Sequence, residues 1–279
     1  MDKISDLERK IVLLALEEDE AKNDVTTNSL SEFDSDITAV VIAKEDGVIS
    51  GTGMFISTFT EVDLSVKVRV LKEDGSKVFK GDIAIELVGP KTSILRGERT
   101  ALNFLQRLSG IATLTKKYAD LIKGSGITLL DTRKTTPGMR YAEKKAVKDG
   151  GGTNHRMNLQ EMAMIKDNHI RMAGTISKAV DMIRKRSPGT RIEVEVTCIN
   201  ELKEALSKNV DIIMLDNFDT SLLDEAVRLK DKGVKYEISG NVTLDNIKTR
   251  IHKGIDFISS GSLTHSFKSL DLSLEIADK

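Results

Sequence analysis

The first third of the chain switches between helical and strand-like spacing of its apolar residues. Residues 4–18 carry apolar side chains at roughly helical intervals, which predicts one helix followed by a polar loop at residues 24–27. From residue 37 to residue 88 the apolar period is two, with hairpin-type turns at Glu45-Asp-Gly47 and Glu73-Asp-Gly75. We therefore expect a small β-rich unit after the first helix.

Helical spacing then returns over one long stretch. Apolar residues recur every three or four positions between residues 92 and 123, and the Ser109-Gly110 pair lies in the middle of this run. The pattern predicts two helices with a break at this pair, joining the β-rich unit to the rest of the chain.

Past residue 126 short apolar runs alternate with amphipathic segments, a pattern typical of a parallel sheet or a βα barrel. The predicted strands are residues 127–130, 162–165, 191–196, 211–215, 235–238 and 256–259. The predicted helices between them are residues 141–148, 176–186, 199–206, 221–231 and 245–252.

Composition limits the classes of function. The 279 residues suffice for one large or two smaller domains, and 42 basic against 43 acidic residues leave no global field for nucleic acid or an anionic membrane. The single cysteine, Cys198, and four histidines rule out an internal disulfide and a Cys/His zinc cluster. The apolar run at residues 11–16 is too short for a signal segment or a membrane span, so we expect a cytoplasmic protein.

Charged residues gather after the predicted strands, where barrel enzymes place their chemistry. The strand ends read Asp131-Thr-Arg-Lys-Thr-Thr-Pro-Gly138, Lys166-Asp-Asn-His169, Asp216-Asn217, Ser239-Gly-Asn241 and Ser260-Gly-Ser262. The cations at these ends or in the 150–156 loop are Arg133, Lys134, His155, Arg156 and Lys166, with Arg99 and Arg107 on the preceding helix. Each alone would be read as a surface charge, but their joint placement predicts a site for a polyanionic small molecule.

The strand Ile192-Glu-Val-Glu-Val196 puts two carboxylates on one face. In a closed barrel Glu193 and Glu195 would point into the interior and would need a cation or a metal-bound ligand. An exposed edge strand with one wet face explains the same alternation, and the sequence does not choose between these two readings.

Two further features point to a phosphorylated substrate. The corners Ser239-Gly240 and Ser260-Gly261 follow the last two predicted strands, where barrels commonly bind phosphate through backbone N–H groups. Glu195 and Asp216 offer the oxygen ligands that Mg²⁺ prefers when it is bound to such a substrate. We expect a Mg²⁺-bound phosphorylated substrate beside a second anionic one.

Several blocks together resemble the quinolinate phosphoribosyltransferase family, also called nicotinate-nucleotide pyrophosphorylase (carboxylating). They are Arg96-Gly-Glu-Arg-Thr-Ala-Leu-Asn103, Gln106-Arg-Leu-Ser-Gly-Ile-Ala-Thr113, Asp131-Thr-Arg-Lys-Thr-Thr-Pro-Gly138, Gly150-Gly-Gly-Thr-Asn-His-Arg156, Ile165-Lys-Asp-Asn-His169, Glu193-Val-Glu-Val196, Ile213-Met-Leu-Asp-Asn217 and Gly261-Ser-Leu-Thr-His-Ser266. Two positions depart from the family pattern: Asn23 precedes Asp24 where a glycine is usual, and Asn241 follows Gly240 where a second glycine is usual. We expect phosphate still to bind, because asparagine tolerates positive φ better than most residues.

The resemblance implies an α/β fold: an N-terminal α/β sandwich domain followed by an incomplete TIM-like βα barrel. We place the first domain at residues 1–110 and the barrel at 111–267, with the tail at 268–279 packing back on the first domain. The resemblance also implies a homodimer, possibly part of a higher oligomer, in which each site borrows Arg99 from the neighbouring subunit.

The implied reaction transfers phosphoribosyl from phosphoribosyl pyrophosphate (PRPP) to quinolinate with decarboxylation, giving nicotinate mononucleotide, CO₂ and pyrophosphate for NAD biosynthesis. By resemblance, Arg133, His155, Arg156 and Lys166 hold quinolinate, with Thr132 in the same motif. Lys134, Glu195 and Asp216 match positions around PRPP and its Mg²⁺, and are the residues we expect to act in catalysis. Ser239, Gly240, Asn241, Ser260 and Gly261 lie at the 5′-phosphate, and no organic cofactor is expected, since the ribosylated ring is its own electron sink.

Four other readings stay open at this point. A sister branch associated with molybdenum uptake shares the fold, and a nicotinate-specific phosphoribosyltransferase would need fewer cations. A Schiff-base aldolase using Lys134 or Lys166 is a further enzyme reading. A ligand-sensing or assembly protein on a decayed barrel would have no reason to keep every charged strand end.

Overall fold

The computed structural model describes residues 4–277, and these residues form two compact units. The first unit contains the chain up to Lys116, the segment Thr135–Gly151 and the chain from Leu263 onward, and the second contains Lys117–Lys134 and Gly152–Ser262. The segment 135–151 was predicted in the barrel domain, but its Lys145 Nζ lies 2.6 Å from Asp74 Oδ2 of the first unit. Residues 1–3 and 278–279 of the predicted domain ranges lie outside the described residues.

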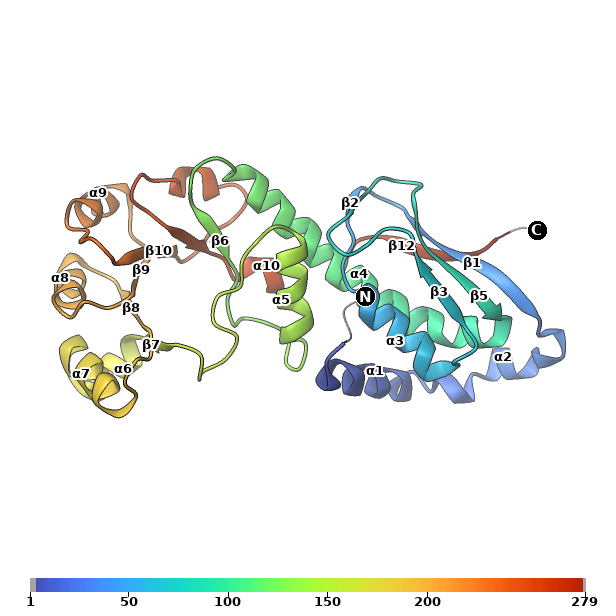
Figure 1. Ribbon diagram of the computed structural model, residues 1–279. Coiled ribbons are helices and arrows are strands. Elements are labelled where there is room, and N and C mark those ends of the chain that lie inside the picture. Colours follow the sequence, from blue (N-terminus) through green and yellow to red (C-terminus); the bar gives the residue numbers. More distant parts are fainter. Residues whose placement is uncertain (1–3, 278–279) are drawn as a thin grey trace. The chain divides into compact units, whose positions relative to one another are not determined.

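An antiparallel sheet organises the first unit (Figure 1). Its order is β12 (Leu272–Ile276), β1 (Asp36–Ala43), β5 (Ile83–Pro90) and β3 (Lys67–Val70), and a separate two-stranded ladder joins β2 (Gly47–Val48) to β4 (Lys77–Val78). In β12, Leu274 is paired with Val41 of β1, so the end of the described chain completes the sheet of the first unit.

Several helices belong to the first unit. They are α1 (Asp6–Glu18), α2 (Val25–Ser29), α3 (Thr52–Val62), the start of α4 (Lys91–Leu121) and α5 (Arg140–Asp149), with short 3₁₀ turns at η1 (Ala21–Asn23) and η2 (Ser31–Phe33). Of these, α3 and the start of α4 pack on the buried face of the sheet. Alternate residues of β1, among them Val41, pack with Phe55 and Phe59 of α3 and Leu102 of α4 in one core. Helix α1 confirms the first predicted helix.

Two short helices lie where the sequence predicted a loop and a purely β-rich unit, so both predictions are wrong at these positions. Helix α2 begins where a loop was predicted, because the Asp24 carboxylate accepts the backbone N–H groups of Thr26 and Thr27 as an N-cap. Helix α3 lies inside the stretch predicted to be β-rich, and its buried residues Met54, Phe55, Thr58 and Phe59 follow helical rather than alternating spacing.

The predicted break near residue 110 is wrong, because α4 is one continuous helix from Lys91 to Leu121. A Cβ on Gly110 would lie 2.3 Å from the backbone oxygen of Lys268 and 2.8 Å from the Cα of Ser269. Gly110 is therefore needed for the close approach of another chain segment, and the helix tolerates the propensity cost of a mid-helix glycine.

A six-stranded parallel sheet forms the frame of the second unit (Figure 1). Its order is β6 (Thr128–Leu130), β11 (Phe257–Ser259), β10 (Lys235–Ser239), β9 (Ile212–Asp216), β8 (Ile192–Val196) and β7 (Ala163–Ile165). All six predicted strands are confirmed to within one residue at each end. The open strand order from β6 to β7 agrees with the expected incomplete barrel.

Helices connect the strands of the second unit. They are α6 (Asp167–Ala173), α7 (Ile176–Arg186), α8 (Ile199–Ser207), α9 (Thr220–Arg228) and the 3₁₀ helix η3 (Ile247–Arg250). Helix α10 (Ser262–His265) instead follows the last strand and continues into the first unit. Helix α6 was not predicted, and the helix predicted over residues 245–252 is only the short turn η3. Among the described residues, no helix is both long and apolar enough to cross a membrane.

Candidate active site

The register of the parallel strands places the predicted site residues on one face of the sheet. Glu195 of β8 pairs with Met214 of β9, and Asp216 of β9 pairs with Ser239 of β10. Because side chains two residues apart along a strand, and those paired across a parallel ladder, point the same way, these polar groups share a face. The opposite face carries apolar residues such as Val194, and all of these polar groups lie at the carboxyl ends of their strands.

Strand β8 is not an edge strand, since it lies between β7 and β9. Glu193 is fully buried, and Glu195 is partly buried with 18% of its side chain exposed. Of the two readings left open by the sequence, the interior one is confirmed and the exposed-edge one is wrong.

The first pair at this edge joins two predicted roles. Lys166, which follows β7, forms an ion pair with Glu195 of the neighbouring strand β8. Lys166 was predicted to hold quinolinate and Glu195 to lie near PRPP, so the structure brings these two predicted subsites into contact. In this pair each charge offsets the other.

The next strand ends form a tight corner. Asp216 accepts a hydrogen bond from the Asn217 amide at 3.0 Å, and a Cβ on Gly240 would lie 2.3 Å from Asn217 Oδ1 and 2.9 Å from Asp216 Oδ1. Gly240 has a φ of 89° and Asn241 a φ of 47°, both in the left-handed region. Asn241 thus adopts the conformation expected for the usual glycine, which asparagine tolerates among non-glycine residues.

The second Ser-Gly corner is tied to the first. The Ser260 hydroxyl donates to the backbone oxygen of Val242 at 2.9 Å and is 2.5 Å from the hydroxyl of Ser262, and Ser260 itself is 3% exposed. The turn that contains Gly261 follows directly. These bonds connect the chain after β11 to the chain after β10, so both predicted phosphate corners belong to one hydrogen-bonded group.

Two predicted arginines lie within electrostatic reach of each other. The pKa of Arg156 is lowered first by burial and then by the positive charge of Arg133, while the Glu193 carboxylate raises it. The Arg156 guanidinium donates to the Met162 backbone oxygen at 2.8 Å. Like charges held close together in a partly buried position favour a multiply charged anion as ligand.

Asp131 fixes the loop that carries Arg156. Its buried carboxylate accepts the backbone N–H of His155 at 2.8 Å and the side-chain amide of Asn154 at 2.6 Å. Asp131 opens the Asp-Thr-Arg-Lys motif, and residues 154–156 form the Asn-His-Arg motif, so one carboxylate joins the two most specific blocks of the sequence.

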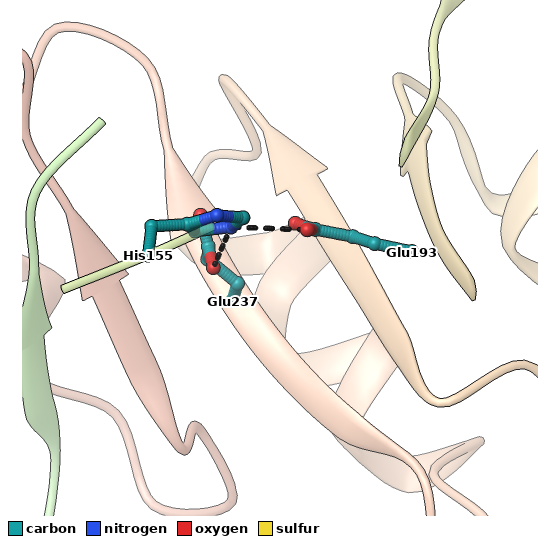
Figure 2. A group of neighbouring side chains, drawn as sticks. All are labelled: His155, Glu193 and Glu237. Carbon is teal, nitrogen blue, oxygen red and sulfur yellow. Dashed lines mark ion pairs between the residues drawn. The ribbon is translucent and has the colours of Figure 1, made fainter. Parts of the chain in front are cut away.

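His155 does not point outward from this loop. Its side chain is only 6% exposed, and Nε2 lies 3.0 Å from Glu193 Oε2 and 3.4 Å from Glu237 Oε2 (Figure 2). Burial alone would lower the pKa of this imidazole, but the two carboxylates outweigh burial and raise it to about 10. Burial raises the pKa of Glu193, and His155 partly offsets that effect.

Thr132, Lys134 and Arg99 complete the set of predicted site residues. Thr132 is partly buried and accepts the backbone N–H of Lys134, whose side chain is exposed. Arg99 is exposed on α4 in the first unit and forms no ion pair among the described residues. Arg107 pairs at 2.7 Å with the fully buried Glu143, which identifies it as a structural cation within the first unit.

Comparison with known proteins gives the family. Residues 24–109 match the model of the quinolinate phosphoribosyl transferase N-terminal domain, and residues 111–275 match that of its C-terminal domain. The chain belongs to the quinolinate phosphoribosyltransferase family.

Curated relatives of this family cover nearly the whole chain. One is nicotinate-nucleotide pyrophosphorylase [carboxylating] of Arabidopsis thaliana, 42% identical over 96% of this chain and 82% of that protein. Another is the probable nicotinate-nucleotide pyrophosphorylase [carboxylating] of Bacillus subtilis, 39% identical over 93% of this chain and 90% of that protein.

The fold agrees with solved structures of the family. The nicotinate-nucleotide pyrophosphorylase from Francisella tularensis superposes with a TM-score of 0.94 at 40% identity, covering 99% of this chain and 100% of that chain. The two-domain α/β architecture expected for the family is thereby confirmed.

Sequence reasoning missed two residues of the candidate site. Glu237 was inside a predicted strand but received no role, although a carboxylate within Lys235-Tyr-Glu-Ile-Ser239 is the same signal as Glu193 in β8. Asp131 was part of the motif that identified the family, but its hydrogen bonds to residues 154 and 155 depend on a contact 23 residues away in sequence.

Proposed function

We propose that the protein transfers the phosphoribosyl group of PRPP to the ring nitrogen of quinolinate and releases pyrophosphate and CO₂, giving nicotinate mononucleotide. The observation that carries this proposal is the shared sheet face at the carboxyl edge. Glu195, Asp216 and Ser239 lie there in adjacent strands, and Lys166 follows the next strand. Arg156 lies within electrostatic reach of Glu193 in β8 and of Arg133.

In the transfer step, charges of opposite sign develop on the sugar and on the leaving group, and each must be stabilised. As the bond from the ribose carbon to pyrophosphate breaks, positive charge develops on the sugar and negative charge on the leaving group, while the ring nitrogen of quinolinate forms the new bond. The carboxylates of Glu195 and Asp216 stabilise the sugar charge, and Lys134 stabilises the leaving pyrophosphate. The phosphate end of PRPP binds the backbone N–H groups of the corners at Gly240 and Gly261.

Magnesium enters this scheme with PRPP. The carboxylates of Glu195 and Asp216 lie on one face of adjacent strands and supply the oxygen donors that this ion prefers, so the residues fit it. They would hold the ion, which neutralises charge on the pyrophosphate when bound. On binding, Lys166 exchanges its contact with Glu195 for a carboxylate of quinolinate.

Decarboxylation needs no further group. Once ribosylated, the ring nitrogen is cationic. When CO₂ leaves the adjacent ring carbon, the electron pair of the broken C–C bond stays on that carbon, where the positive charge stabilises it. The carbon then takes up a proton. The task of Arg133, Arg156 and Lys166 is to orient the two carboxylates without over-stabilising the one that is lost. This is also why a Schiff base on Lys166 has no part in the proposed reaction.

We further propose that the site is completed by a second copy of the chain. Support comes from Arg99, an exposed cation on α4 that no carboxylate of the described chain neutralises. In a two-fold dimer each subunit supplies Arg99 to the partner site, so that two composite sites form. The proposed location of the enzyme is the cytoplasm, which stays a prediction from the sequence.

Substrate choice tests the proposed function. Nicotinate lacks the carboxylate that quinolinate loses, so binding it leaves part of the cationic set unpaired. A site built on such polar groups rejects the analogue by about 10⁴-fold or more in kcat/KM. Initial rates with the two acids, at saturating PRPP and Mg²⁺, are the measurement, and comparable turnover of nicotinate would disprove the proposal.

A further inference from the structure

The buried group His155, Glu193 and Glu237 has no assigned part in the proposed reaction beyond the predicted contact of His155 with quinolinate. Figure 2 shows the imidazole approached by a carboxylate from β8 and another from β10, the two strands that flank β9. Both glutamates have no exposed surface. A buried carboxylate is costly without a partner, so these three groups must be considered together.

The two ring nitrogens of His155 have different partners. Nδ1 accepts the backbone N–H of Arg156 at 2.7 Å, and Nε2 faces the two carboxylates at 3.0 and 3.4 Å. A nitrogen that accepts a hydrogen bond carries no proton, so in the neutral ring the proton is on Nε2. The two carboxylates favour a second proton on the ring, whereas the Arg156 N–H disfavours a proton at Nδ1, so in either state the proton beside the carboxylates is on Nε2.

This assignment decides between two roles for the group. One histidine and two carboxylates at such distances could also bind a metal ion, and their ligand atoms all lie within 4.8 Å of one another. A metal on Nε2 would require the ring proton on Nδ1, directly opposite the Arg156 N–H. The hydrogen bond to Nδ1 therefore favours a proton, not a metal, between the ring and the carboxylates.

We propose that Glu193 and Glu237 are positioning residues, whose charged carboxylates attract the protonated Nε2 edge of His155 and thereby fix the backbone of Arg156 for quinolinate binding. His155 is then an internal anchor, because both of its nitrogens are used within the protein, and Arg156 is the group that touches the substrate. This inference rests on the proposed function for the identity of the ligand, but not for the placement of the ring.

The placement is tested without substrate. In ¹⁵N-labelled protein the long-range histidine spectrum contains four residues, and His155→Gln identifies the signals of His155. We expect a protonated Nε2 at neutral pH, and a changed His155 signal in Glu237→Gln. An unprotonated Nε2, or a transition metal bound in one-to-one ratio after purification, would overturn the proposal.

The positioning role is tested by a double-mutant cycle on quinolinate binding. Glu237→Gln should raise the KM and the calorimetric Kd for quinolinate by about tenfold to a hundredfold, with kcat and the KM for PRPP changed by less than about threefold. Glu225→Gln makes the same chemical change on the exposed face of α9 and should leave all constants unaltered. Far-UV circular dichroism verifies that both variants are folded.

The cycle is completed with His155→Ala alone and combined with Glu237→Gln. If Glu237 acts through His155, the double variant binds quinolinate no more weakly than His155→Ala. Additive losses, or a fall in kcat with an unchanged KM, would overturn the positioning role. A wild-type protein that binds no quinolinate would instead overturn the proposed function, with the histidine spectrum still deciding where the ring proton lies.

Discussion

Replacing Gly240 by alanine should separate the PRPP side of the site from the quinolinate side. At this position φ is 89°, and an added Cβ would meet Asn217 Oδ1 at 2.3 Å and Asp216 Oδ1 at 2.9 Å. Two costs follow. The left-handed backbone costs an alanine about 1–2 kcal/mol of stability, and Asn217 with Asp216 must retreat by about 1 Å to restore van der Waals contact.

The chain offers a matched control for the backbone cost. Gly189 has a φ of 79°, lies in the exposed turn between α7 and β8, and has no atom within 4 Å of an added Cβ. Gly189→Ala should lower the free energy of unfolding by the backbone cost alone, and therefore by less than Gly240→Ala, as measured by urea denaturation, and should keep wild-type activity.

The two variants should differ in kinetics. A displacement of about 1 Å at Asp216 is expected to lower kcat/KM for PRPP by about a hundredfold in Gly240→Ala. The calorimetric Kd for quinolinate should stay within about threefold of wild type, since Arg133 and Arg156 are not touched. Equal activity of the two alanine variants would refute the placement of PRPP at this corner.

Three further predictions concern catalysis, assembly and packing. Lys134→Ala should lower kcat and kcat/KM together by about 10² to 10³-fold with a smaller change in quinolinate affinity; a raised KM at normal kcat in steady-state assays would show a binding role instead. Arg99→Ala and Lys166→Ala should each be nearly inactive, whereas random subunit exchange, verified by mass, should recover about a quarter of wild-type activity; no recovery would place Arg99 in its own chain. Gly110→Ala should destabilise the first unit by about 1–3 kcal/mol in thermal denaturation, because of the Lys268 backbone oxygen at 2.3 Å; a stabilised variant would mean that helix propensity outweighs packing at this position.

The parallel sheet could be predicted from the sequence because its strands are short, mainly apolar runs, each followed by a polar segment. Burial on both faces gives β8 and β9 near-continuous apolar character, interrupted at Glu193 and Glu195 by the residues of the site. The alternation of apolar and acidic residues in β8 predicted that Glu193 and Glu195 share a face. The strand order, which makes that face an interior, was not visible in the sequence.

The errors have physical causes of the same kind. Helix α3 is apolar on most sides, because it is packed between α1 and the sheet, so its sequence lacks the polar stripe that marks a surface helix. Gly110 resembled a helix break because a close approach by residues 268–269 has no local signature. The pairing of His155 with Glu193 and Glu237 depends on three segments that only the folded chain brings together.

The most direct test of the account follows one carbon atom. Quinolinate labelled with carbon-14 in the carboxyl group next to the ring nitrogen is incubated with the protein, PRPP and Mg²⁺. Because CO₂ loss depends on the cationic ring nitrogen, we predict labelled CO₂, nicotinate mononucleotide and pyrophosphate in equal amounts, and no labelled CO₂ when PRPP is omitted. Release of the label without PRPP, or a nucleotide product that retains it, would contradict the account.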